Sequence, residues 1–416
     1  MAQTTILLIG TLDTKGDELA YVRDLIVARG HTVLTLDAGT GEPAWTPDIG
    51  ADRVATAGGG DLAALREAND RAAALDVMCR GVRAVALELL ATGDIGGVIG
   101  MGGSGGTAIA TSAMRAMPVG LPKVMVSTMA SGDVSAYVDV KDITMMPSVV
   151  DVSGLNRLSR RILANAAGAV CGMAEQQIPP AEDRPLITAT MFGVTTPCVT
   201  RLRERLEATG YEVLIFHAVG SGGRAMESLI ADGFVTGVAD VTTTELADEL
   251  IGGLLSAGPD RLGAAARAGL PQVVSVGALD MCNWAGMETV PERFRDRTLY
   301  KHNPQVTLMR TTPAENAELG RILAEKLNAA TGPVALYLPL RGVSMIDADG
   351  MPFWSPEADA ALFDAIRAAV DPAVVELVEL DLHINDPAFA DAMTNRLIAM
   401  LAERAAGAPV ATPTQE

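Results

Sequence analysis

A glycine-rich loop between a strand-like and a helix-like segment is the feature of this sequence that most strongly suggests chemistry. Residues 100–107 read Gly-Met-Gly-Gly-Ser-Gly-Gly-Thr and follow an apolar run. Glycines at the start of a helix let backbone N–H groups approach a phosphate closely, and the helix dipole favours its negative charge. We therefore expect phosphate contacts from Gly102, Gly103, Ser104, Gly105, Gly106 and Thr107.

Two other interpretations of this loop remain open. It fits the G-x-S-x-G pattern of a nucleophile elbow, in which Ser104 would attack a substrate with a histidine of the other domain as the base. It is also consistent with a tight turn that needs only small residues. A dinucleotide site is not indicated, because no acidic residue ends a strand about 20 residues further on, as that fingerprint requires.

The segment after the first apolar run offers a second set of groups for a phosphate. Residues 10–16 read Gly-Thr-Leu-Asp-Thr-Lys-Gly, which is not a Walker A motif because the lysine precedes its glycine. Thr11, Thr14 and Lys15 can donate hydrogen bonds to phosphate oxygens. Asp13 can hold Mg²⁺ or a ribose hydroxyl. A solvated helix start is the alternative interpretation.

A glycine loop and a hydroxyl-rich segment in the second half of the chain can contact another ligand. Residues 220–227 (GSGGRAME) follow His217, which is either a general base or a satisfied core residue. Residues 240–245 (DVTTTE) also fit a helix capping box. With Lys15, His217 and Arg224 are the candidate catalytic residues. We expect a carboxylate or single phosphate to be bound by Gly222, Gly223, Arg224, Thr242, Thr243, Thr244 and Glu245.

Alternating strands and helices must position these loops. Residues 4–39 read as strand, helix and strand, and residues 185–220 repeat the pattern, with Gly210 standing 180 positions after Gly30. Such alternation predicts parallel, doubly wound sheets, in which ligands bind at the carboxyl ends of the strands. A long helical stretch at 61–92 is expected to break near Gly81. In the second half, strands are expected near 234–239, 273–276, 306–309, 334–338 and 374–380.

We therefore predict an α/β protein with two Rossmann-like domains whose sheets are mainly parallel. The proline-containing segment 176–185 is the expected linker. The N-terminal, nucleotide-binding domain should span residues 1–180 and the C-terminal domain residues 181–406, followed by a flexible tail at 407–416.

Composition excludes several classes of partner. A net charge of −19 over 416 residues repels a nucleic-acid backbone. No apolar run approaches the roughly 18 residues of a membrane span. The four cysteines are far apart and form no C-x-x-C pair, which fits the reducing cytoplasm. The sequence thus predicts a cytoplasmic protein with a small-molecule ligand.

Several short strings resemble a family of ATP-binding proteins. They include GTLDTKG, MGGSGGT, FHAVGSGGRAME, DVTTTE and HINDP, and the similarity covers about residues 4–405. That family includes the N-terminal inhibitory domain of the tomato mosaic virus resistance protein. The resemblance implies ATP and Mg²⁺ as ligands. It also implies a homodimer, and the mean hydropathy of +0.26 favours the homodimer as well. The larger plant protein carries a further domain resembling a phosphoenolpyruvate-utilising barrel, so an activity that relies on it would need a separate barrel-domain protein here.

The expected function is that of an ATP-dependent enzyme. It would carry out phosphoryl transfer or a ligase-type reaction on a small acidic metabolite held in a cleft between the domains. Two alternatives belong to other classes: a nucleotide-binding regulatory module without turnover, and a metal-independent hydrolase that uses Ser104.

Overall fold

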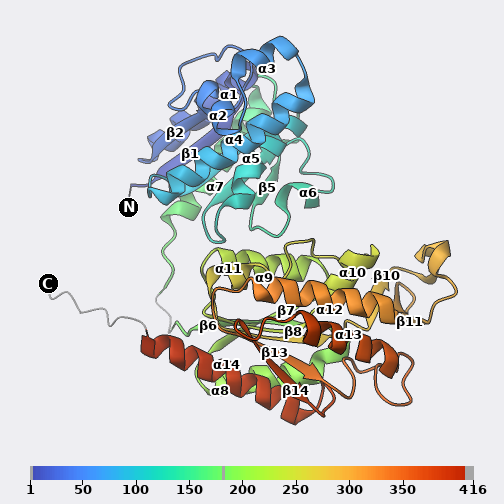
Figure 1. The fold of residues 1–416 in the computed structure, drawn as a ribbon. Helices are drawn as coiled ribbons and strands as arrows, with labels where there is room; N and C mark the ends of the chain where they lie inside the picture. Colours follow the sequence, from blue (N-terminus) through green and yellow to red (C-terminus); the bar gives the residue numbers. More distant parts are fainter. Residues whose placement is uncertain (1–2, 180–182, 408–416) are drawn as a thin grey trace. The chain divides into compact units, whose positions relative to one another are not determined.

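The computed structural model describes residues 3–179 and 183–407 and divides the chain into two units, Met1–Ala181 and Glu182–Glu416. Each unit has a parallel sheet between two layers of helices (Figure 1). The boundary predicted after residue 180 lies outside the described residues. So does the predicted tail, except for Gly407, where the last helix ends.

The sheet of the N-terminal unit has the strand order β2-β1-β3-β4-β5, with every neighbouring pair parallel. Its elements are β1 (Thr5–Gly10), α1 (Leu12–Ala28), β2 (Thr32–Asp37), α2 (Ala51–Ala57), α3 (Leu62–Ala68), α4 (Arg71–Ala91), β3 (Gly97–Gly102), α5 (Ser104–Ala116), β4 (Lys123–Ser127), α6 (Ser135–Val138), β5 (Thr144–Pro147) and α7 (Arg157–Glu175).

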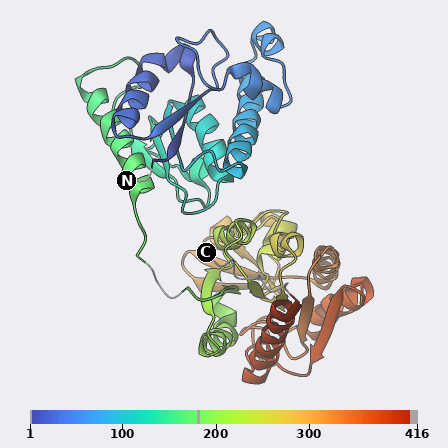
Figure 2. The same cartoon turned by 90° about the vertical axis from the view of Figure 1, so that its left-hand side faces the viewer.

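The central strand β1 explains the layering of this unit. Its apolar residues alternate in direction, as side chains of a strand do. Leu7 and Ile9 pack against α2, α4 and α5, whereas Ile6 and Leu8 pack against α1 and α7. Figure 2 shows α7 (green) and α1 (dark blue) on the side of the sheet opposite to α4 (light blue). Burial on both faces is why the strand reads as an unbroken apolar run.

The C-terminal unit has the order β14-β13-β9-β8-β6-β7, again with parallel neighbours. Helices α8 and α14 pack on one face, and α9, α11, α12 and α13 pack on the other. The elements are β6 (Leu186–Met191), α8 (Thr196–Ala208), β7 (Glu212–His217), α9 (Ser221–Ala231), β8 (Gly237–Thr242), α10 (Glu245–Ile251), α11 (Ala264–Ala268), β9 (Gln272–Gly277), α12 (Pro313–Asn328), β13 (Val334–Pro339), α13 (Pro356–Ala369), β14 (Val375–Leu380) and α14 (Pro387–Gly407).

One predicted strand does not belong to the parallel sheet. Residues 306–309 fall in β12 (Val306–Arg310), which pairs antiparallel with β10 (Met281–Trp284) and β11 (Leu299–Asn303). Only two residues join β11 to β12. A connection that short can join antiparallel strands but cannot cross over to a parallel one. The three strands form a separate small sheet between β9 and α12 in the chain.

The predicted helix break at Gly81 is wrong. The long helical stretch breaks instead at Asn69, which adopts a left-handed φ of 48°, and Asp70 then caps α4. Gly81 lies inside α4, where a Cβ atom would come within 1.9 Å of the Val54 carbonyl oxygen on α2. This glycine therefore allows two helices to approach each other closely and does not end one.

None of the helices in residues 3–179 and 183–407 combines the length and the apolar character that crossing a membrane requires.

Candidate functional site

Sheet topology selects one place in the N-terminal unit for a ligand. From β1 the chain passes to β2 on one side, and from β3 it passes to β4 on the other. Loops that leave two adjacent strands in opposite directions open a crevice at the carboxyl edge of the sheet, the topological switch point of doubly wound folds. The loops after β1 and β3 are the two glycine-containing segments that the sequence predicts to bind phosphate.

A cavity of about 780 Å³ occupies this switch point. Its polar side comes from the loops after β1, β2 and β3, and helices α3, α4 and α5 supply the other walls. These loops, together with the end of β3 and the first turns of α1 and α5, contribute Thr11, Asp13, Thr14, Lys15, Gly39, Thr40, Gly41, Gly102, Gly103, Ser104, Gly105 and Gly106. The helical segments contribute Leu65, Arg66, Asn69, Asp70, Arg71, Ala74, Leu75, Met78 and Ile109.

The structure thus brings the two predicted phosphate segments to one cavity, with one exception. Thr107 is fully buried behind the glycine loop. Its hydroxyl donates to the Gly103 carbonyl at 2.8 Å and shares a 2.6 Å hydrogen bond with the Ser127 hydroxyl. Thr107 therefore supports the loop from the side of the sheet.

The glycines of the loop serve two different purposes. A Cβ atom at Gly102 would lie 3.1 Å from the Gly106 Cα, and one at Gly106 would lie 3.1 Å from the Met101 carbonyl oxygen. Glycine at these two positions lets α5 pack tightly against β3. At Gly103 and Gly105, by contrast, the nearest atoms to such a Cβ would be 3.8 Å away. The room beside these two glycines belongs to the cavity.

The N-terminus of α5 is open toward the cavity. Its N-cap, Gly103, supplies no side chain, and the first N–H groups of a helix have no partner within the helix. No hydrogen bond from the N–H groups of Ser104, Gly105 or Gly106 reaches any other described residue. These donors and the helix dipole form an anion-binding surface.

Lys15 and Asp13, in the first turn of α1, also line the cavity. The Lys15 ammonium donates one hydrogen bond to the Val152 carbonyl oxygen, and an ammonium group has three N–H donors. Asp13 accepts a 2.7 Å hydrogen bond from the Gly41 N–H through Oδ2, while its Oδ1 is buried without a partner. Among the charged residues that line the cavity, Asp13 and Lys15 therefore both have unused hydrogen-bonding capacity.

Asp37, at the end of β2, holds the loops around the cavity in place. Its Oδ1 accepts hydrogen bonds from the Leu12 N–H at 2.9 Å and from the Gly39 N–H at 2.8 Å. Burial raises the pKa of this carboxyl group above its usual value. By joining the start of α1 to the loop after β2, Asp37 fixes the positions of the neighbouring cavity walls.

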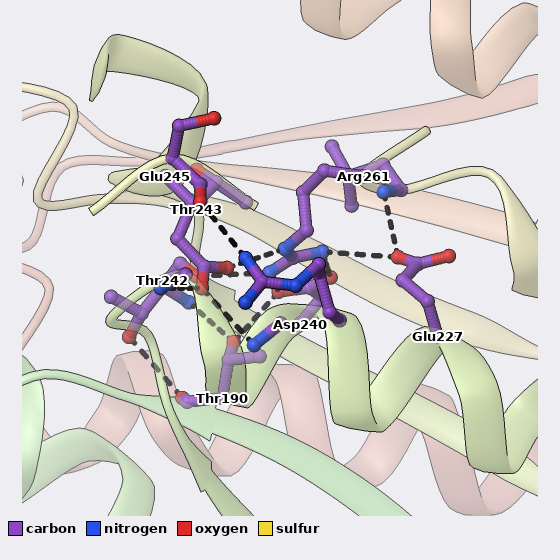
Figure 3. Close-up of polar contacts among 12 residues, drawn as sticks. Thr190, Glu227, Asp240, Thr242, Thr243, Glu245 and Arg261 are labelled. Atoms are coloured by element: carbon purple, nitrogen blue, oxygen red, sulfur yellow. Dashed lines mark hydrogen bonds and ion pairs between the residues drawn. The ribbon is translucent and has the colours of Figure 1, made fainter. Parts of the chain in front are cut away.

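The equivalent switch point of the C-terminal unit, between β6 and β8, is closed by side chains. The hydroxyls of Thr195 and Thr242 share a 2.8 Å hydrogen bond there. Beside them Arg261, with no exposed side-chain surface, lies between Asp240, Glu227 and Glu245 (Figure 3). The Arg261 Nε donates to Glu245 at 2.6 Å.

The predicted ligand contacts in this unit make internal bonds. The Glu245 carboxylate accepts hydrogen bonds from the N–H groups of Gly220 at 2.7 Å and Gly223 at 3.0 Å. A Cβ atom at Gly222 would lie 1.8 Å from the His217 carbonyl oxygen. The fully buried hydroxyls of Thr243 and Thr244 donate to backbone carbonyls, at 3.1 Å and 3.3 Å respectively.

Two predicted catalytic residues of this unit lie at its surface. His217 is the last residue of the edge strand β7, with its ring edge-on to Phe192 at a centroid distance of 5.4 Å. Arg224, on α9, donates to the Ser256 carbonyl oxygen at 3.3 Å. The binding of a second ligand by these residues stays a prediction.

Sequence reasoning missed the wall of the N-terminal cavity that α3 and α4 provide. Arg66, Arg71, Leu75 and Met78 belong to helices whose sequences show ordinary amphipathic spacing. Their presence at the site follows from the path of the chain after β2. The loop after β2, with Gly39 and Gly41, was also missed, although its adjacency to β1 is a signal available in a βαβ pattern.

Comparison with known proteins places the chain in a family. Residues 4–179 match the N-terminal domain, and residues 184–401 the C-terminal domain, of the Uncharacterised protein family (UPF0261). A UPF0261 protein of Clostridium tetani is 52% identical over 398 residues, which are 95% of this chain and 98% of that protein. The ToMV susceptible protein tm-1(GCR26) of Solanum lycopersicum is 37% identical, over 94% of this chain and 55% of the tomato protein.

Likeness to solved structures is weak. UDP-N-acetylglucosamine 2-epimerase from Rickettsia bellii aligns over 66% of this chain and 79% of its own, with 10% identity and a TM-score of 0.24, which is too low to carry an argument. The sequence matches, in contrast, cover both units. The chain therefore belongs to the Uncharacterised protein family (UPF0261) and is homologous to the tomato Tm-1 proteins.

Proposed function

We propose that the N-terminal unit binds ATP together with Mg²⁺ in the cavity between the loops after β1 and β3. The observation that carries the proposal is the meeting of an open helix N-terminus and the Lys15 ammonium at the switch point of a parallel sheet. Both groups bind phosphate well. The cavity of about 780 Å³ also falls within the roughly 300–1,000 Å³ of small-molecule sites.

The two sides of the cavity suit the two ends of a nucleotide. The phosphates would lie on Gly103–Gly106, opposite Lys15 and the hydroxyls of Thr11 and Thr14. An apolar wall would then face the base. That wall consists of Leu65, Leu75, Met78 and Ile109. A mostly apolar surface with a few convergent polar groups is typical of cofactor sites.

Asp13 is the proposed protein ligand of Mg²⁺. Its Oδ1 is buried without a hydrogen-bond partner, so it has an oxygen to offer a cation. Among the described residues, no group of three or more His, Cys, Asp or Glu side chains could hold a metal by itself. One carboxylate nevertheless fits Mg²⁺, which nucleotide sites commonly bind through one or two carboxylates plus the phosphates. When bound, the ion would neutralise phosphate charge.

We propose further that the bound ATP serves a phosphoryl-transfer or ligase-type reaction on a small acidic metabolite. Lys15 would offset the charge of the transferred group. His217 and Arg224, both exposed on the C-terminal unit, are the candidates to meet the metabolite. A nucleotide-binding module without turnover is the alternative, and the homodimer stays a prediction.

The hydrolase alternative would need a histidine of the C-terminal unit as the base for Ser104. Ser104 lies at the cavity, but His31 is the histidine of residues 3–179, and it precedes β2 at the opposite edge of the sheet. There its Nε2 lies 3.0 Å from Glu175. No histidine of this unit therefore stands beside Ser104 to act as its base.

Replacing Gly105 with valine should abolish ATP binding without unfolding the unit. A Cβ atom at this position would meet no protein atom closer than 3.8 Å, so the added methyl groups would project into the cavity. Isothermal titration calorimetry with Mg²⁺ and ATP would measure the loss. Gly172→Val on α7 is the matched control, because a Cβ atom there also has nothing within 4 Å. Wild-type affinity in a folded Gly105→Val protein would contradict the proposed site.

A further inference from the structure

Arg71 is an arginine beside the open helix N-terminus, and neither sequence motif contains it. It is the first residue of α4, and it lines the cavity. A Cβ atom placed on Gly105 would lie 3.8 Å from the Arg71 Nη2 and 3.9 Å from the Leu75 Cδ1. The guanidinium group therefore lies close to the first turn of α5, with room for only a small group between them.

No acidic side chain of the described residues forms an ion pair with this guanidinium group. Within residues 3–179 and 183–407, the Arg71 side chain makes no ion pair or hydrogen bond. The adjacent carboxylate, Asp70, instead caps α4 by accepting from the N–H groups of Ala72 at 2.9 Å and Ala73 at 3.1 Å. Arg71 thus lines the cavity with all of its N–H donors unused by the described residues.

A second arginine of the cavity shows the contrast. Arg66, on α3, donates to the carbonyl oxygens of Thr40 and Gly41, the latter at 2.8 Å, and pairs with Glu42 at 3.2 Å. Arg66 therefore ties α3 to the loop after β2. Its hydrogen bonds are used within the protein, whereas those of Arg71 are available.

The position of Arg71 is unfavourable for the protein alone. A cation in the first turn of a helix opposes the helix dipole, which favours anions there. Arg71 stands in that position on α4, and the N-terminus of α5 faces the same cavity. The Asp70 carboxylate already supplies a negative charge at the N-terminus of α4, so the guanidinium converges with one uncapped positive helix end, that of α5. An anion between them would relieve this repulsion, and a guanidinium can contact two phosphate oxygens at once.

We propose that Arg71 binds the phosphate group that lies on the N-terminus of α5, as a binding residue that the sequence motifs do not include. The proposal rests on the proposed function in that it takes the cavity to be a phosphate site. It adds that α4 contributes a cation to this site beside that of Lys15.

The test compares three variants of the full chain by calorimetry with Mg²⁺ and ATP. Arg71→Ala should weaken ATP binding about 10- to 100-fold, the range for loss of a charged hydrogen bond. Arg71→Lys should recover only part of this loss, because a lysine keeps the charge but not the planar fork. Arg83→Ala is the matched control: it removes the same charge from the exposed surface of α4, outside the cavity, and should leave affinity within about 2-fold.

Thermal unfolding separates binding from folding. Because Arg71 is exposed and makes no hydrogen bond or ion pair with the described residues, Arg71→Ala should keep the unfolding midpoint of the unliganded chain or raise it slightly. A loss of affinity together with a lowered midpoint would make Arg71 a structural residue and overturn the proposal.

The failure of this proposal is distinguishable from failure of the proposed function. If the wild-type chain binds ATP and Arg71→Ala binds it equally well, the role of Arg71 is refuted and the ATP site stands. If the wild-type chain does not bind ATP, inorganic triphosphate becomes the probe. The role of Arg71 would be supported if Arg71→Ala weakens triphosphate binding and Arg83→Ala does not. It would be refuted if triphosphate does not bind, or if Arg71→Ala leaves its binding unchanged.

Discussion

In both units a carboxylate accepts hydrogen bonds from backbone N–H groups of a glycine-containing loop. In the C-terminal unit this occupies a helix N-terminus, whereas in the N-terminal unit it leaves one open. Glu245 accepts from Gly220 and Gly223, so the N-terminus of α9 already has an anion supplied by the protein. In the N-terminal unit Asp13 reaches Gly41, and the N-terminus of α5 keeps its donors. The glycine patterns predict such donors but not which ones an internal acid will occupy, because Glu245 lies on another helix, after another strand.

The buried Arg261 should be among the most sensitive single residues of the C-terminal unit. Arg261→Met would leave the carboxylates of Asp240 and Glu245, both almost fully buried, without their counter-charge. Removing one member of a buried ion pair costs about 3–5 kcal/mol. Chemical denaturation followed by tryptophan fluorescence should show this loss in a Trp45→Phe background, in which Trp284 and Trp354 report on this unit.

Arg321→Met supplies the control for this measurement. Arg321 pairs with Glu318 and Glu325 at the exposed surface of α12, so its removal should change the free energy of unfolding far less. Equal effects of the two substitutions would show that the Arg261 network does not stabilise the unit.

At the scale of elements, α2 holds α4 against the sheet and thereby places Arg71 at the cavity. A Cβ atom at Gly58 would lie 2.1 Å from the Val77 carbonyl oxygen of α4, and one at Gly81 would lie 1.9 Å from the Val54 carbonyl oxygen. Two glycines on facing helices thus allow close contact of their backbones. Sequence reasoning treated Gly81 as a helix breaker, because the contact that explains it is made with a helix more than 20 residues away.

Gly81→Ala should therefore destabilise the N-terminal unit by about 1–3 kcal/mol, the usual cost of overpacking. In Gly168→Ala on α7 the same change meets no atom within 4 Å, and the better helix propensity of alanine should stabilise the unit by about 0.5–1 kcal/mol. Urea denaturation followed by Trp45 fluorescence, in a background with Trp284→Phe and Trp354→Phe, would give both values. Stabilisation by Gly81→Ala would mean that α2 and α4 do not pack as described.

Local sequence patterns predicted the strands of the parallel sheets well. They failed for the small antiparallel sheet, in which strand pairing depends on more than the pattern of each strand. Buried runs such as residues 4–10 and 334–338 read directly as β1 and β13. The strands β10 and β11 are short and were not predicted, and β12 was expected in the wrong sheet. Their pairing depends on the two-residue connection between β11 and β12 and on packing. The spacing of apolar residues along a strand reveals neither.

At the scale of the whole molecule, the stability of the C-terminal unit should fall as pH rises from about 5 to 8. Burial and the nearby Asp347 raise the pKa of Asp280 to about 8, and the same causes raise that of Asp359 to about 7. In the unfolded chain these groups titrate near about 3.9. The folded state therefore holds protons that the unfolded state has released, and stability is lost until the folded groups also ionise.

Fluorescence-monitored denaturation of the Trp45→Phe chain across this pH range would measure the slope. Asp280→Asn should reduce it, since an amide does not titrate and its oxygen can still accept the 2.8 Å hydrogen bond from Ser344. A slope that Asp280→Asn leaves unchanged, or stability that rises with pH, would contradict the assignment.

The central claim is that the cavity at the switch point of the N-terminal unit binds ATP with Mg²⁺. A crystal structure of the full chain with Mg²⁺ and a non-hydrolysable ATP analogue tests it most directly. We expect phosphate density within hydrogen-bonding distance of the N–H groups of Gly103–Gly106, with Lys15 and Arg71 also in contact with the phosphates. Nucleotide density in the C-terminal unit would contradict the claim. So would an empty cavity at a ligand concentration that, by calorimetry, saturates the chain.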